Sequence, residues 1–245
     1  MKLLAVIPAR HGSTRFPGKP LASVAGLPMI QRVYERVLSS GACDKVVVAT
    51  DDARIAAVVE EFGGHVVMTS EDCANGTIRC HETVERLEAE GETFDAVLNV
   101  QGDEPFVHPD QIAQLADLLH KPDAAVVTLA KSMPADPEFQ SPHRVKVVRN
   151  LKGRAQMFSR SPLPHGNGPW LQHVGLYGFT RSALEALVQL SPTPLEQRER
   201  LEQLRWLDHG WRIDVGTTTH LTPAVDTPED LVAIEQLIQA GDLPI

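Results

Sequence analysis

Apolar, β-branched runs alternate with helix-patterned segments along roughly the first 130 residues, and this alternation constrains the fold most strongly. We expect strands at Leu3–Ile7, Lys45–Thr50, His65–Met68, Ala96–Val100 and Ala124–Ala130. Residues that favour helix starts lie between them: Pro28, Asp51 or Asp52, Gly76-Thr77 and Pro109. Right-handed crossovers place such strands parallel and the helices on both faces of the sheet. The sequence therefore predicts an α/β fold with a Rossmann-like, mostly parallel sheet.

The pattern changes from about residue 131. Two strand-like runs, Val145–Arg149 and Leu171–Phe179, are separated by a loop rich in Pro, Gly and Ser. We expect helices at Arg181–Leu190 and Leu195–Leu207, and a short strand at Ile213–Val215. A capped helix, Thr227–Ala240, ends the pattern. We predict a single domain, 1–245, with an inserted smaller α+β subdomain at about 131–215 and a terminal helix that returns to the main sheet.

Charge and cysteine content limit the partners. The formal net charge of −9 argues against broad binding to nucleic acid or to an anionic membrane, which needs an extended basic face. No apolar run approaches the roughly 20 residues of a membrane span, and the N-terminus does not resemble a signal peptide. The cysteines Cys43, Cys73 and Cys80 are odd in number and lack metal-type spacing. We therefore expect reduced thiols and a cytoplasmic location.

The loop after the first strand, Ile7–Leu21, concentrates positive charge. It holds two glycines, three prolines and the cations Arg10, Arg15 and Lys19, and the first acidic residue of the chain is Glu35. Five residues separate its glycines and Pro20 follows Lys19, so the loop is not a P-loop. Backbone N–H groups and fixed cations suit a polyphosphate. A solvated turn with incidental cations is the alternative.

Gln101–Pro105 follows another predicted strand, so it should face the same crevice as the opening loop. Magnesium usually takes one or two protein carboxylates, and Asp103 would project there. Asp226 is the natural second ligand if the end of the chain folds back. From the residues alone, Asp103 could equally be a turn-former beside Gly102, and Asp226 a helix cap.

Further motifs, in order along the chain, make the pattern specific. They are Pro8-Ala9-Arg10, Ser13-Thr14-Arg15, Pro17-Gly18-Lys19-Pro20-Leu21, Val48-Ala49-Thr50-Asp51, Gly76-Thr77 with Arg79, Asn99 to Pro105, Phe158-Ser159-Arg160, His173 with Gly175 and Tyr177, Leu201 to Arg205, and Val225 to Leu231. Together they span nearly the whole chain, and the chain resembles the 3-deoxy-manno-octulosonate cytidylyltransferase (CMP-Kdo synthetase) family.

The resemblance implies an enzyme that activates a 3-deoxy sugar acid (Kdo) with CTP, giving CMP-Kdo and pyrophosphate for lipopolysaccharide biosynthesis. It implies catalytic roles for Arg10, Lys19 and Asp103. It implies nucleotide binding by Arg10, Ser13, Arg15, Lys19, Arg79 and Gln101, and sugar binding by Arg160, His173, Tyr177, Glu202 and Gln203. Mg²⁺ would be held by Asp103 and Asp226, and the family is homodimeric.

Several alternatives stay open. The loop Ser161–Pro169 differs from the family pattern on the sugar side, so 8-amino-Kdo or another sugar acid is an alternative substrate. A sialic acid cytidylyltransferase, or a sugar-1-phosphate enzyme using another NTP, is the next enzyme class. A non-catalytic nucleotide-sensing module on the same fold is the alternative outside enzymes.

Overall fold

The computed structural model describes residues 1–12, 16–134, 136–220, 223, 225, 227–240 and 243. The chain forms two compact units: unit 1 comprises Met1–Ala113 with Thr222–Ile245, and unit 2 comprises Gln114–Leu221. Unit 1 is thus built from both ends of the chain, with unit 2 inserted between them in sequence.

Unit 1 contains a parallel sheet of four strands in the order β6 (Ala96–Asn99), β1 (Leu3–Ala9), β4 (Lys45–Thr50) and β5 (Val66–Met68). The apolar run of β1 is fully enclosed, since Leu3 to Ile7 are each at most 1% exposed. Strands covered on both faces need such continuous apolar runs. The predicted strands in this part of the chain are confirmed.

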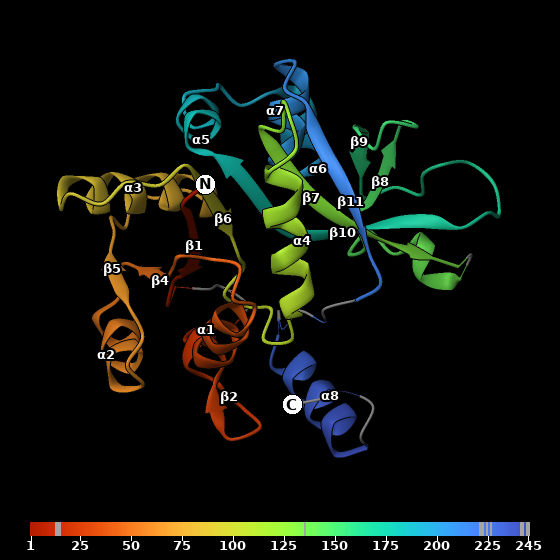
Figure 1. Cartoon of the computed structure of the whole chain (residues 1–245). Helices are drawn as coiled ribbons and strands as arrows, with labels where there is room; N and C mark the ends of the chain where they lie inside the picture. The colour runs from red at the N-terminus through yellow and green to blue at the C-terminus, as the bar shows by residue number, and fades with distance from the viewer. Residues whose placement is uncertain are drawn as a thin grey trace. The chain divides into compact units, whose positions relative to one another are not determined.

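Three helices join these strands and cover the sheet. Figure 1 shows α1 (Met29–Ser39) and α2 (Ala53–Glu61) on one side of the strands and α3 (Gly76–Ala89) on the other. Of the two aspartates predicted as caps, Asp52 begins α2, because its side chain accepts a hydrogen bond from the Arg54 N–H. The predicted parallel sheet with helices on both faces is therefore present in unit 1.

The opening loop leads into a short 3-10 turn (η1, Lys19–Leu21) and a two-stranded hairpin, β2 (Ser23–Val24) and β3 (Leu27–Pro28). The terminal helix α8 (Pro228–Ala240) returns to unit 1, where it packs beside the hairpin and the start of α1. Its residue Ile234 packs in one apolar cluster with Val24, Met29, Phe106 and Val225. This cluster anchors the C-terminal segment to unit 1.

Helix α4 (Pro109–Leu119) carries the chain into unit 2. There β11 (Ile213–Thr218) pairs in parallel with β7 (Val126–Met133), and β7 pairs antiparallel with β10 (Trp170–Thr180). The strand β8 (Lys146–Arg149) pairs antiparallel with both β10 and β9 (Ala155–Ser159), and the 3-10 turn η2 (Pro137–Gln140) precedes β8. The sequence pattern missed β9, whose polar and apolar residues alternate weakly.

One predicted helix is wrong in extent. The stretch Leu195–Leu207 is two short helices, α6 (Pro194–Glu199) and α7 (Gln203–Asp208), and α5 (Arg181–Leu187) is shorter than expected. Arg200 adopts a left-handed conformation with φ of 55°, which ends α6. Among the described residues, no helix is long and apolar enough to cross a membrane.

Candidate active site

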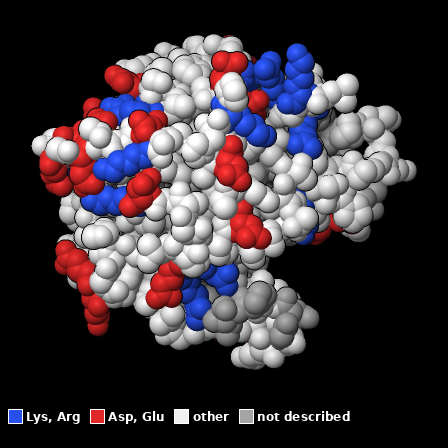
Figure 2. Space-filling model, in the orientation of Figure 1, with Lys and Arg blue, Asp and Glu red and all other residues white. Residues whose placement is uncertain are grey.

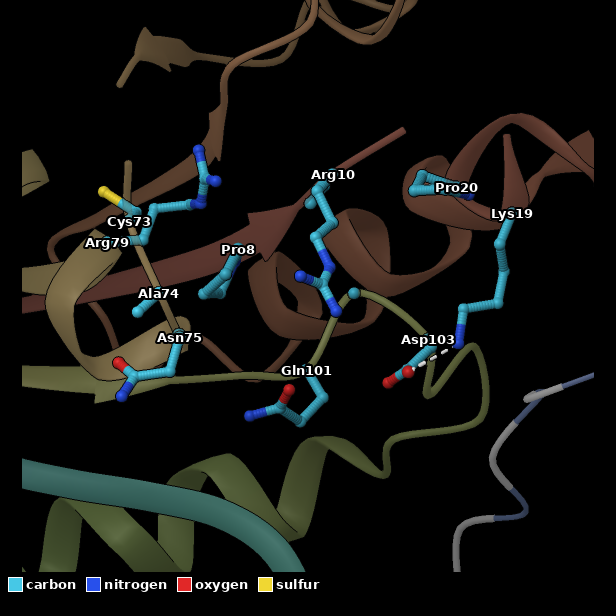
Figure 3. Close-up of a pocket in the computed structure, with 13 residues that line it drawn as sticks. Pro8, Arg10, Lys19, Pro20, Cys73, Ala74, Asn75, Arg79, Gln101 and Asp103 are labelled. Carbon is cyan, nitrogen blue, oxygen red and sulfur yellow. Dashed lines mark hydrogen bonds and ion pairs between the residues drawn. The ribbon is translucent and has the colours of Figure 1, made fainter. Parts of the chain in front are cut away.

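A pocket of about 310 Å³ opens at the carboxyl ends of β1 and β6; we call it the β1/β6 pocket (Figure 3). The chain leaves β1 toward β4 on one side, whereas β6 lies on the other side of β1. The strand order therefore reverses here, and ligands of open α/β sheets bind at such switch points. The pocket lies entirely within unit 1.

Three segments that are distant in the sequence meet at Lys19. Its Nζ donates a hydrogen bond to Asp103 Oδ2 at 2.7 Å (Figure 3). It donates another to the Val225 carbonyl at 2.8 Å. The Val225 N–H in turn donates to the Asp103 carbonyl at 3.0 Å. Lys19 is only 9% exposed. The predicted return of the chain end to Asp103 is thus observed at Val225, the residue before Asp226.

Glycines let the loops approach this point. Gly18 has φ of 73°, and its N–H donates to the His11 carbonyl at 3.0 Å, so the chain turns sharply just before Lys19. Gly102 sits against β1: a Cβ there would lie 2.7 Å from the Pro8 carbonyl oxygen. Only glycine fits at that distance, and it sets the position of the adjacent Asp103.

Arg10 and Gln101 lie across the pocket from each other. Arg10 follows β1 on the surface, and its guanidinium extends over the pocket toward Gln101 (Figure 3). Gln101 donates a weak hydrogen bond from Nε2 to Asn99 Oδ1 at 3.4 Å. Within the described part of the chain Arg10 makes no ion pair, so this cation is available to an anion in the pocket.

Arg79 lines the pocket but uses its guanidinium elsewhere. Nη2 donates to Asp51 Oδ2 at 2.9 Å, and Nη1 donates to Thr69 Oγ1 at 2.5 Å. The side chain is 3% exposed. Arg79 therefore ties α3 to the ends of β4 and β5, and presents its buried aliphatic part to the pocket wall.

Sequence reasoning missed other lining residues, among them Asn75 and Cys73. The Asn75 side chain caps α3 by accepting from the Ile78 N–H at 2.9 Å, so the positive end of that helix dipole lies at the pocket. The Asn75-Gly76-Thr77 sequence could have indicated this cap, because Asn is a preferred residue just before the first turn of a helix. The Cys73 thiol donates to Glu82 Oε2 at 3.0 Å. Burial and the Glu82 carboxylate raise the pKa of Cys73 to about 11, so it is a neutral thiol.

Ser13, Arg15 and Asp226 lie outside the described residues. The remaining predicted residues divide between the units. Arg10, Lys19, Arg79, Gln101 and Asp103 gather around the β1/β6 pocket of unit 1. The predicted sugar-binding residues all belong to unit 2: Arg160, His173, Tyr177, Glu202 and Gln203.

Within unit 2, His173 and Tyr177 lie together on β10. Their ring centroids are 5.4 Å apart, and His173 Nε2 is 3.0 Å from Thr128 Oγ1. Burial lowers the pKa of His173 to about 3, so the imidazole is neutral. Burial and the charge of Glu202 raise the pKa of Tyr177 far above its usual value. Its hydroxyl is enclosed without a hydrogen-bond partner among the described residues.

The other two predicted sugar residues border this group. Gln203 is buried at the first position of α7, whose Trp206 ring meets the Tyr177 ring edge-on at 5.1 Å. Arg160 follows β9, and its guanidinium donates to the carbonyls of Glu199 at 2.8 Å and Pro142 at 3.0 Å. The structure thus brings His173, Tyr177 and Glu202 together, while Arg160 holds the loops around β9.

Lys146 supports Arg160 and was not predicted. It is fully buried on β8, and its Nζ donates to the carbonyls of Ser141 at 2.6 Å and Arg160 at 3.1 Å. The ammonium also lies over the Trp170 ring, 5.8 Å from its centroid. Burial and the neighbouring Arg160 lower the pKa of Lys146. A lysine at the start of a short strand carries no sequence signal of burial.

Nucleotidyl transfer needs a site of this kind. The pocket lies at a strand switch point and is lined by cations that can bind phosphate and by a carboxylate. The chain belongs to the cytidylyltransferase family, whose sequence model matches residues 4–213. A cytidylyltransferase structure from Leptospira borgpetersenii serovar Hardjo-bovis (strain JB197) shares the fold: the TM-score is 0.62 at 18% identity, covering 98% of this chain and 95% of that one.

More specific relatives are 3-deoxy-manno-octulosonate cytidylyltransferases. That of Myxococcus xanthus (strain DK1622) is 49% identical, with 98% of this chain and 97% of the relative covered. That of Parabacteroides distasonis (strain ATCC 8503) is 45% identical, with 94% and 96% covered. A solved CMP:2-keto-3-deoxy-manno-octonic acid synthetase complexed with CTP has a TM-score of 0.92 at 39% identity, covering 98% of this chain and all of that one. These matches confirm the resemblance found in the sequence and the predicted α/β fold class.

Proposed function

We propose that this protein transfers the cytidylyl group of CTP to 3-deoxy-manno-octulosonate, giving CMP-Kdo and pyrophosphate for lipopolysaccharide biosynthesis. The observation that carries the proposal is the Lys19–Asp103 pair in the β1/β6 pocket, 2.7 Å long and facing Arg10. It combines phosphate-binding cations with a carboxylate at one strand switch point. The full-length relatives named for this activity support the same reaction.

The cations have the first role, which is to hold the triphosphate. Arg10 and Lys19 would contact the phosphates together with Ser13 and Arg15, and the positive end of α3 adds to the field. Gln101, with its amide at the pocket, is placed to meet the base or ribose. Arg79 would contribute by fixing the pocket wall through Asp51 and Thr69. Such preorganised charge lowers the barrier without reorganisation during the reaction.

Magnesium fits the donor set at Asp103. The Asp103 side chain is 33% exposed, so its carboxylate oxygens reach the pocket while the backbone is held by Val225. Hard oxygen ligands of this kind are those that Mg²⁺ takes, and Asp226 follows Val225 directly. When bound, the ion would neutralise charge on the α-phosphate and lower the pKa of the attacking hydroxyl.

The reaction is a direct displacement. The anomeric hydroxyl of the sugar acid loses its proton to solvent, and its oxygen forms a bond to the α-phosphorus of CTP as the bond to the bridging oxygen of the β-phosphate breaks. Pyrophosphate leaves with the electron pair, and Arg10 and Lys19 stabilise its charge. The raised pKa of Cys73 keeps the nearest thiol protonated, which supports a route without a covalent enzyme intermediate. Alignment and charge neutralisation then carry the catalysis.

Unit 2 would supply the sugar contacts. Neutral His173 and the unpartnered Tyr177 hydroxyl offer hydrogen bonds to sugar hydroxyls, and Glu202 and Gln203 add an acceptor and an amide. Arg160 uses three of its five N–H groups on carbonyl oxygens, which leaves two for the sugar carboxylate. The alternative substrate 8-amino-Kdo carries the same carboxylate, so it offers the same group to Arg160.

The setting proposed for the enzyme is the cytoplasm, as a homodimer, with CTP and the sugar acid as its ligands. The net charge of −9 and the three free cysteines support this setting, without nucleic acid or a membrane as a general partner. Light scattering of the purified protein measures the homodimer directly: a mass of one chain, 26.8 kDa, would contradict it.

The decisive experiment is mass spectrometry of products from CTP, Mg²⁺ and either Kdo or 8-amino-Kdo. We expect CMP-Kdo and pyrophosphate, and their loss in Asp103→Asn, which keeps the shape and removes the charge. Asp95→Asn, just before β6 and so at the opposite end of that strand from the pocket, is the matched control and should react normally. CTP binding without pyrophosphate release from any sugar acid would refute the enzyme and favour a nucleotide sensor. Normal turnover of Asp103→Asn at saturating Mg²⁺ would refute the role of Asp103.

A further inference from the structure

Unit 2 contains a second pocket, of about 760 Å³, that shares no lining residue with the β1/β6 pocket. It is formed by the end of α4, the turn between β8 and β9, and β11. Its charged lining residues are Lys121, Arg149, Lys152, Arg154, Arg212 and Asp214. We call it the unit 2 basic pocket.

The charge of this pocket is opposite to that of the chain. Among the described lining residues five cations face a single carboxylate, whereas the whole chain has a net charge of −9. Figure 2 shows Lys and Arg side chains gathered at the upper right of the view, over the β8–β9 turn and β11. A concave surface that concentrates one sign of charge attracts ligands of the other sign. This group of cations is therefore a local exception to the acidic composition of the chain.

The guanidinium group of Arg149 is held in place by neutral partners. Arg149 donates from Nη1 to the Val215 carbonyl at 2.7 Å and from Nη2 to Thr217 Oγ1 at 2.8 Å. These bonds orient the group, and within the described part of the chain its charge stays uncompensated and three of its five N–H groups stay unused. Arg149 is therefore preorganised, and an anion would bind it at a reduced entropic cost.

The one carboxylate is shared. Asp214 accepts from Arg212 Nε at 3.0 Å and lies 3.9 Å from Arg154 Nε. One negative charge therefore faces two guanidinium groups. The side chains of Lys121 and Lys152 have no hydrogen bond or ion pair to the rest of the described chain. The pocket thus keeps an excess of positive charge after every internal pair is counted.

The turn that presents Lys152 and Arg154 is also ordered. Asn150 Oδ1 accepts from the N–H groups of both residues, at 2.9 Å and 3.1 Å. The carbonyl of Gly153, a residue with φ of 77°, accepts a hydrogen bond from the Val215 N–H at 2.7 Å, so the turn is tied to β11. The cations on opposite sides of the pocket are therefore held on one framework.

We propose that the unit 2 basic pocket binds a ligand with two or more phosphate groups. Arginines held by carbonyls, with lysines at the rim, match the multiple oxygens and charge of such groups. The phosphates could belong to a free metabolite or to a lipid head group. Leu151, at the tip of the same turn, is fully exposed and would contact the acyl region in the second case. The inference does not depend on the proposed function.

The test measures binding of inorganic pyrophosphate to the full chain by equilibrium dialysis. Every protein compared, including the otherwise native one, carries Lys19→Met, which weakens phosphate binding at the β1/β6 pocket. CTP is left out because its own triphosphate would compete for the unit 2 basic pocket. The variant Lys121→Gln/Lys152→Gln removes two unpaired surface cations and should fold normally. We expect its affinity for pyrophosphate to be at least about tenfold lower, since each charged hydrogen bond contributes at that level. Binding should also weaken as salt is raised. The control Lys2→Gln/Arg54→Gln makes the same change of net charge in unit 1 and should bind like the native protein.

A parallel arm distinguishes the source of the phosphates. Flotation with vesicles of phosphatidylcholine, with and without phosphatidylglycerol and a phosphoinositide, is repeated with Lys121→Gln/Lys152→Gln and with Leu151→Ser. If pyrophosphate binds and the lysine variant weakens that binding, the pocket takes a free phosphate ligand. Vesicle binding alone, weakened by both variants, supports it with a lipid head group. The proposal is overturned if neither probe binds, or if the control variant weakens binding as much as the lysine variant.

Discussion

Gly102→Ala tests whether the close contact between the ends of β1 and β6 positions the Asp103 carboxylate. The added Cβ would lie 2.7 Å from the Pro8 carbonyl oxygen and within 3.7 Å of Ile30 and Ala9 side-chain atoms. Pro8 cannot retreat freely, because β1 is paired with β4 on one side and with β6 on the other. The loop that carries Asp103 must therefore move instead.

The size of the effect follows from that distance. An ordinary contact begins at about 3.4 Å, so the Gly102 backbone must shift by about 0.7 Å, and Asp103 moves with it. A misplacement of about 1 Å at a reacting centre can cost about 100-fold in rate, so we expect kcat to fall by about 10- to 100-fold. Overpacking of this kind costs about 1–3 kcal/mol of the free energy of unfolding.

The assay pairs pyrophosphate release at saturating CTP and sugar acid with urea unfolding of the same preparations. Gly168→Ala is the matched control for stability, because a Cβ there meets no atom within 4 Å. Its free energy of unfolding should equal that of the native protein. If Gly102→Ala retains full kcat and full stability, the contact with Pro8 does not position Asp103 and the reasoning fails.

Three further predictions concern single side chains. Lys19→Met removes the ammonium that Asp103 and Val225 hold, so kcat/KM for CTP should fall about 100- to 1,000-fold. The control Lys2→Met should keep the native kcat/KM. Equal kcat/KM values for the two variants would contradict the role of Lys19. Arg79→Met leaves the Asp51 carboxylate beside an apolar side chain, so urea unfolding should show a loss of about 3–5 kcal/mol in the free energy of unfolding. The exposed Arg54→Met should show no measurable change. A loss under about 1 kcal/mol for Arg79→Met, the size expected of a surface ion pair, would mean that the Arg79–Asp51 pair is solvated. Burial lowers the pKa of His173 to about 3, so between about pH 6.5 and pH 3 the unfolded chain binds a proton at His173 that the folded chain does not bind. The free energy of unfolding should therefore decline as the pH falls through this window, and less steeply in His173→Gln. Parallel declines in the two proteins would contradict the neutral buried imidazole.

Much of the site could be located from the sequence, because its signals are local. The absence of any carboxylate before Glu35 marked the opening loop, and Gly102-Asp103 followed a clear apolar strand. Parallel-sheet topology then predicted that both loops face one crevice, and the pocket lined by Lys19 and Asp103 confirms it. The roles of the individual residues in binding nucleotide, sugar and metal stay predictions.

The sequence by itself determined the elements that depend on neighbouring residues. Continuous β-branched runs must be buried strands, and Asp52 before an apolar stripe begins a helix, because cap and stripe act within a turn or two. Helix α6 shows the limit of this reasoning. Nothing local marks Arg200 as left-handed, and the single predicted helix is two.

Only the tertiary structure decided which side chains meet. It set the guanidinium of Arg79 on Asp51 and Thr69, enclosed Lys146 under Arg160, and joined Lys19 to a carbonyl more than 200 residues away in the chain. It also gathered five cations around one pocket of an acidic protein. These contacts bring together residues from separate elements, and their energies depend on burial and distance, which no local pattern encodes.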